Sequence, residues 1–123
     1  MISHTYHDWL LTCIRLEGSD VVLTVAEETG QTATIRLIGS KHLLAVDFLM
    51  GNIISRIVVA RVSDSNLEEV HKFFMDFSCE KYFNEKLDDF FSSIKNDNYV
   101  VEVVPTYGAM LCCICSDLQE QKG

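Results

Sequence analysis

The spacing of apolar residues changes twice along the chain, and this limits the folds open to it. Residues 9–62 consist of short β-prone runs separated by turn-forming clusters. Residues 66–95 instead repeat apolar side chains every three or four positions, as amphipathic helices do. Residues 98–116 return to β-prone runs. Because no Pro- or Gly-rich linker separates these parts, we expect one domain over residues 1–123, with one shared core.

Short clusters of Gly, Ser, Asp, Glu and Asn divide the first part into five runs. Such short connections favour neighbouring antiparallel strands, so the pattern predicts an antiparallel meander sheet. In the fourth run, alternation predicts that Phe48 and Met50 share a face with Val46. Gly51-Asn52 then predicts a tight hairpin turn into the fifth run. The expected strands cover residues 9–16, 21–26, 33–37, 42–50 and 53–62.

Two helices are expected in the middle of the chain. Ser65 and Glu68 fit a capping box at the start of the first helix. Ser78 is placed to cap a second helix, which ends before 96–98. A hairpin over 98–116 follows, and the tail after it is expected to fray. The predicted fold class is therefore α+β: an antiparallel meander sheet with two helices packed on one face, in a single domain.

Charge narrows the classes of partner. The chain has 18 acidic and 10 basic residues and a formal net charge of −8. Nucleic-acid surfaces are generally basic, so DNA or RNA binding is not expected. An acidic surface also repels anionic lipid, and the longest apolar runs fall far short of the about 20 residues that span a bilayer. The composition favours a basic protein partner.

Cysteine usage and the N-terminus predict a cytoplasmic protein. The five cysteines are an odd number, and three lie within 112–115, unlike the framework of a secreted disulfide protein. Residues 1–8 lack the basic and apolar regions of a signal peptide. Cys112 and Cys115 form a C-x-x-C motif inside an expected strand, where they point to opposite faces. We interpret these thiols as core residues and expect no metal or cofactor.

Catalytic motifs are missing from the sequence. Neither a nucleophile elbow nor a Gly-rich phosphate loop occurs, and the six glycines stand singly at expected turns or ends. His4, His7 and Asp8 cluster only at a terminus. We therefore expect no enzymatic activity and no catalytic residue. The competing hypothesis of a small enzyme would require a pocket that joins His42 or His71 with a carboxylate and a cysteine.

Acidic residues concentrate in the helical part. Between residues 63 and 98 the sequence has nine acidic residues and only four lysines. One interpretation is a solvated face that complements the helix dipoles. The other is a surface matched to a basic partner, which raises the rate and specificity of association. The second interpretation predicts a set of partner-binding residues, namely Asp64, Glu68, Glu69, Glu85, Asp88 and Asp89.

Three short stretches carry a resemblance to a known group. They are His7-Asp8-Trp9-Leu10, the run from Phe48 to Ile54, and Pro105-Thr106-Tyr107-Gly108-Ala109. Together they resemble small uncharacterised bacterial proteins, some of which are similar to immunity proteins encoded beside secreted toxins. The resemblance implies a shared fold and transfers no catalytic residue. It also implies that the partner is a toxin domain.

The leading hypothesis is a cytoplasmic, non-enzymatic binding protein that neutralises a basic toxin domain by acidic surface complementarity. The alternative is a structural or self-associating module, such as a homodimer formed through a free sheet edge or an exposed helix face. Both hypotheses predict a protein that acts through its surface. They differ in whether the acidic helical part is covered by a foreign chain or by a second copy.

Overall fold

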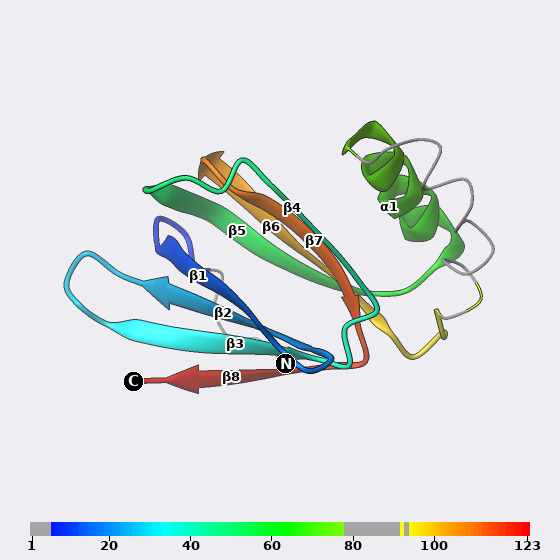
Figure 1. Ribbon diagram of the computed structural model, residues 1–123, viewed down its shortest axis with the longest axis horizontal. Helices are drawn as coiled ribbons and strands as arrows, with labels where there is room; N and C mark the ends of the chain where they lie inside the picture. The colour runs from blue at the N-terminus through cyan, green and yellow to red at the C-terminus, as the bar shows by residue number, and fades with distance from the viewer. Residues whose placement is uncertain (1–5, 78–91, 93) are drawn as a thin grey trace.

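Eight antiparallel strands and one helix form the described part of the chain, which comprises residues 6–77, 92 and 94–123 of the computed structural model (Figure 1). The strands run side by side in the order β4-β7-β6-β5-β1-β2-β3-β8. The elements are β1 (Leu10–Glu17), β2 (Asp20–Ala26), β3 (Thr32–Ile38), β4 (His42–Val46), β5 (Asn52–Arg61), α1 (Asp64–Phe77), β6 (Tyr99–Tyr107), β7 (Met110–Cys115) and β8 (Asp117–Lys122).

The sheet bends back on itself at two adjacent corners. β3 continues into β4 through residues 39–41, and β7 continues into β8 through Ser116. The corners are joined because the Ser116 amide donates to the Ile38 carbonyl at 2.8 Å. Gly39 allows this approach, since it has a φ of +61° and any side chain there would collide with Ser116. In Figure 1 the half containing β5, β6 and β7 meets the half containing β1, β2 and β3 at these corners.

The main core fills the space between the two halves. Alternate residues of each strand point inward, and those from both halves form one buried cluster. Its fully buried members include Leu23 of β2, Ile35 of β3, Val101 of β6 and Leu111 of β7. This packing explains the alternation in the first part of the sequence. It confirms an antiparallel sheet as the centre of the fold.

α1 covers the outer face of the half that contains β6 and β7. Val70 and Phe74 of the helix pack on Val100, Cys112 and Ile114 in a second buried cluster. β6 and β7 therefore bury both of their faces, which accounts for their nearly continuous apolar sequence. The resulting fold is mostly β, and the predicted α+β class is confirmed.

The start of α1 differs from the prediction. Ser63, rather than Ser65, caps the helix, because its hydroxyl accepts the Asn66 amide at 3.4 Å. Asn66 reciprocates by accepting the Ser63 amide at 2.8 Å. The capping box is therefore formed by Ser63 and Asn66, two residues before the predicted pair of Ser65 and Glu68.

Sheet topology corrects the expected simple meander. β1, β2 and β3 do form consecutive hairpins, but β4 pairs with β7, so Gly51-Asn52 does not join a hairpin. β4 ends at Val46, and Phe48 and Met50 are exposed rather than aligned on its face. Asp47 breaks the strand with a φ of +58°.

The C-terminal tail forms a strand of the sheet. The tail expected to fray is β8, which forms a six-residue ladder with β3. The described residues contain one helix, where the sequence predicts two packed on one face. The second predicted helix falls on residues 78–91 and 93, which lie outside the described part of the chain.

Candidate functional site

The first half of the predicted acidic surface lies on α1. Glu68 and Glu69 are exposed, and neither belongs to an ion pair formed among the described residues. Asp64 is the first residue of the helix. Both side chains are therefore accessible at the surface, and their predicted role in binding a partner stays a prediction. The other predicted residues, Glu85, Asp88 and Asp89, lie outside the described residues.

A groove lies beside the contact between α1 and the β6–β7 hairpin, lined by residues of both. Its volume is about 170 Å³, and Val70, Phe73, Val104 and Met110 are among the apolar residues that line it. Two carboxylates, Glu69 of α1 and Glu102 of β6, line the same groove from the helix and from the sheet. The arrangement offers an apolar wall beside two negative charges.

Strand alternation places Glu102 at this groove. Its neighbours Val101 and Val103 are fully buried in the core between the two halves, so Glu102 points outward toward α1. Glu102 lies opposite Cys112 of β7. Sequence reasoning missed Glu102 because its significance depends on which sheet face α1 covers. The isolated acid within the valine-rich run of β6 was the available signal.

Two acidic side chains on the other half of the sheet, Glu17 and Asp20, form ion pairs with arginines. Arg36 contacts Glu17 at 2.9 Å and Asp20 at 3.1 Å, and Arg15 contacts Glu17 at 2.5 Å. Hydrogen bonds from Arg36 and Arg15 lower the pKa of Glu17. The Gly39 amide, followed by Arg36, lowers the pKa of Asp20. These charges are neutralised locally, in contrast with those on α1.

An exposed apolar tip lies where the β4–β5 loop meets the β6–β7 turn. We define the tip as Phe48, Leu49, Met50 and Tyr107, all of them exposed. Buried Asn52 joins the two loops. Its Oδ1 accepts the amides of Leu49 at 2.8 Å and Ala109 at 3.0 Å. The tip is thus an apolar surface held on a fixed backbone, as protein interfaces often require.

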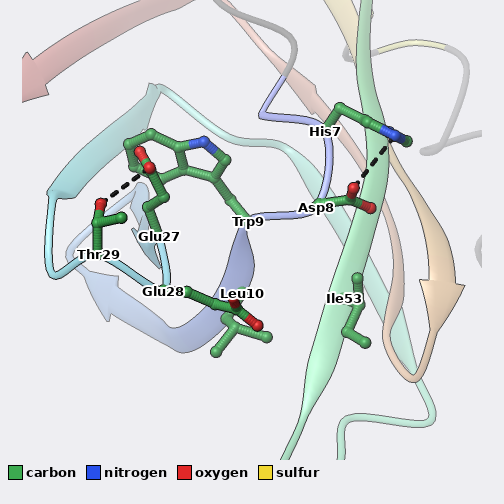
Figure 2. Close-up of a pocket in the computed structure, with 8 residues that line it drawn as sticks. All are labelled: His7, Asp8, Trp9, Leu10, Glu27, Glu28, Thr29 and Ile53. Carbon is green, nitrogen blue, oxygen red and sulfur yellow. Dashed lines mark hydrogen bonds and ion pairs between the residues drawn. The ribbon is translucent and has the colours of Figure 1, made fainter.

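A larger open cleft of about 630 Å³ lies near the start of β1 (Figure 2). His7 and Asp8 form an exposed ion pair at 3.4 Å on one side of Trp9. On the other side, Glu27 accepts the Thr29 hydroxyl at 2.8 Å. Asp8 and Glu27 lie on opposite sides of Trp9, and Thr29 carries the hydroxyl group among the described residues of the lining. Thr29 donates its hydroxyl to Glu27, whereas His7 contacts Asp8 on the other side of Trp9, so the histidine does not contact this hydroxyl.

Burial explains the cysteine pattern. Cys112 faces α1, whereas Cys113 and Cys115 face the core between the halves, which confirms the predicted opposite orientations of Cys112 and Cys115. Burial is the largest cause that raises the pKa of all three thiols, to about 12, about 11 and about 12 respectively. Protonated buried thiols are poor nucleophiles.

The competing enzyme hypothesis requires His42 or His71 to lie beside a carboxylate and a cysteine in a pocket. Neither histidine is among the described residues that line the open cleft or the groove. The ring of His42 lies edge-on to Phe74, with 6.2 Å between ring centroids. Across the described residues, the metal-ligating side chains form no group of three or more.

No helix in the described part of the chain is long and apolar enough to cross a membrane. Comparison with protein-family models, curated proteins and solved structures found no match. A function for this chain therefore has to be argued from its own surface.

Proposed function

We propose that this chain is a non-enzymatic, cytoplasmic binding protein that neutralises a basic protein partner by presenting carboxylates around an apolar centre. One observation carries the proposal: Glu68 and Glu69 are exposed on α1, beside an apolar groove that Glu102 also lines. Exposed charge beside apolar surface is typical of a protein interface, where charge speeds encounter and apolar contact supplies affinity.

The proposed partner is a toxin domain of a toxin–immunity system. This assignment rests on the resemblance described above and on the net charge of −8, which complements a basic protein. The proposed surface also includes Asp64, Glu85, Asp88 and Asp89, as the sequence analysis predicts. An inhibitor of this kind works by occupying its partner's surface and needs no cofactor.

The test uses the full chain and any basic domain that an adjacent reading frame encodes. Reversing charge with Glu68→Lys and Glu69→Lys is expected to weaken binding at least about tenfold, because two attractive contacts become repulsive. Binding by the wild-type chain should also weaken steeply with added salt. Calorimetry at two salt concentrations measures both effects.

A matched control separates local contacts from net charge. The double variant Glu27→Lys and Glu28→Lys changes the charge equally at the distant open cleft, and it should bind nearly as well as the wild type. Reversal of Glu85, Asp88 and Asp89 together tests whether the second predicted helix contributes. The proposal is wrong if the adjacent frames encode no basic domain, or if the α1 reversal leaves binding unchanged.

Self-association is a second candidate, and the apolar tip favours it. Phe48, Leu49, Met50 and Tyr107 offer exposed apolar surface that a second copy could cover. Light scattering over a concentration range should then show a dimer. The double variant Met50→Ser and Tyr107→Ser should restore the monomer without lowering the unfolding temperature. A monomer at every concentration would eliminate this candidate.

A further inference from the structure

We propose that the groove between α1 and the β6–β7 hairpin receives one arginine side chain of the basic partner, with the guanidinium between Glu69 and Glu102 and the methylene stem along Val104 and Met110. This inference rests on the proposed function and adds the chemistry of the central anchor.

Size limits what the groove can hold. Its volume is about 170 Å³, and an apolar cavity of about 150 Å³ accommodates a single benzene-sized group. One long side chain therefore fits, whereas a helix or strand of a partner does not. The partner has to reach into the groove with one residue, as the anchors of protein interfaces do.

The lining selects a side chain that is apolar along its length and cationic at its end. Val104 and Met110 extend the β6 and β7 ladder one position beyond the Val103–Leu111 pair. Their partly buried side chains offer contact to a methylene stem. Arginine satisfies this lining better than an apolar residue, which would leave Glu69 and Glu102 without a cation.

Two carboxylates on different elements favour arginine over lysine. The guanidinium has five N–H donors in a fixed plane and can address both acids, whereas the ammonium of lysine acts as a compact point charge. Neither Glu69 nor Glu102 takes part in the ion pairs formed among the described residues. Arg56 lies opposite Val104 on β5 but does not line the groove.

The electrostatics of Cys112 support negative potential inside the groove. Burial is the main cause that raises the pKa of this thiol, and the negative charge of Glu102 is the next. The geometry agrees with this order of causes, because Glu102 lies opposite Cys112 in the β6–β7 ladder and both residues line the groove. A bound cation would oppose that negative charge.

The experiment titrates the full isotope-labelled chain with N-acetyl-arginine amide and follows the methyl resonances of Val104 and Met110 by NMR. N-acetyl-citrulline amide is the neutral control of nearly the same shape, and N-acetyl-lysine amide tests the alternative cation. The arginine probe is expected to shift Val104 and Met110 and to bind at least about threefold more tightly than either of the others.

Conservative variants then locate the cation. Glu69→Gln and Glu102→Gln are each expected to weaken arginine binding about threefold, and the double variant about tenfold. Glu28→Gln removes the same charge outside the groove and should leave the affinity unchanged. Unfolding temperatures of all four variants verify that each remains folded.

The outcomes distinguish the anchor from the function. Equal binding of citrulline, or equal weakening by Glu28→Gln, overturns the arginine anchor. If the lysine probe binds more tightly than the arginine probe, the proposal that the groove receives arginine is wrong. If the anchor fails while Glu68→Lys with Glu69→Lys still weakens binding to the basic domain, the proposed function stands without it. If wild-type binding to that domain is absent, the proposed function fails by itself.

Discussion

Asn52 links three segments of the chain through one buried amide. Besides accepting two amides through Oδ1, its Nδ2 donates to the carbonyls of Leu49 at 2.7 Å and Leu11 at 3.2 Å. All four hydrogen-bonding positions of the side chain are therefore used. Gly108 allows this arrangement, because it has a φ of +84° and a Cβ there would collide with the Asn52 amide. The residue fixes the loops that carry the apolar tip.

Asn52→Ala is expected to lower the free energy of unfolding by about 3 kcal/mol, because the change leaves buried amides and carbonyls without partners. Urea unfolding followed by circular dichroism measures the loss. Gln31→Ala, an exposed truncation of similar chemistry, should change stability by less than about 0.5 kcal/mol. A loss at Asn52 no larger than that of Gln31 would show that water replaces the lost bonds.

Tyr6 connects the beginning of the described chain to its last strand. The ring is fully buried, lies edge-on to Trp9, and donates its hydroxyl to the Glu120 carboxylate. Burial, and secondly the bond to Glu120, raise the pKa of Tyr6 well above its ordinary value of 10.0. The folded state therefore favours the neutral phenol.

A raised pKa in the folded state predicts alkaline destabilisation. The contribution of Tyr6 is complete below the unfolded pKa of 10.0 and is lost as the pH rises above it. Urea unfolding between about pH 8 and about pH 11 should show a steeper loss of stability in the wild type than in Tyr6→Phe. The buried thiols add a loss common to both proteins. Exposed Tyr107→Phe should follow the wild type; parallel curves for Tyr6→Phe would contradict this assignment.

At the scale of elements, local patterns predicted most strands. The runs that became β1, β2, β3 and β5 alternate or lie between turn clusters, so their positions follow from nearest neighbours in the sequence. The sequence did not reveal which strands pair with each other. β4 pairs with β7 because the sheet bends at Gly39 and Ser116, and this contact joins segments about 70 residues apart.

The tail was mistaken for a frayed end because Asp117–Lys122 contains one apolar residue, Leu118. Its stability comes from the partner strand rather than from its own composition. In the candidate site too, some residues could be identified from the sequence and others only from the packing. Glu68 and Glu69 were identifiable from charge and helical period, whereas Glu102 became part of the site only through the packing of α1 on β6.

Leu118 provides a test of the role of β8. It is buried opposite Leu37 of β3, on the inward face of the sheet. Leu118→Ala is expected to lower the free energy of unfolding by about 3 kcal/mol through lost burial and the cavity left behind. Gln119→Ala, on the outward face of the same strand, should cost less than about 0.5 kcal/mol. Equal effects in urea unfolding would mean that the strand adds little to the core.

For the whole molecule, net charge acts on folding and on binding in opposite directions. The chain carries −8, and the ion pairs among the described residues involve Asp8, Glu17 and Asp20 as the acids. Because the acidic residues outnumber the basic ones, we expect net repulsion between charges over the whole molecule. Self-repulsion of this kind destabilises the compact state.

Added salt should consequently stabilise the fold while it weakens capture of a basic partner. The screening length falls from about 30 Å at 0.01 M to about 8 Å at 0.15 M ionic strength, which reduces repulsion across the surface. The unfolding temperature is expected to rise by a few degrees over that range, and choline chloride should match sodium chloride if screening is the cause. A falling temperature would show that the Arg36 pairs outweigh the repulsion. Opposite salt responses of stability and affinity would identify the excess carboxylates as a binding surface maintained at a cost to the fold.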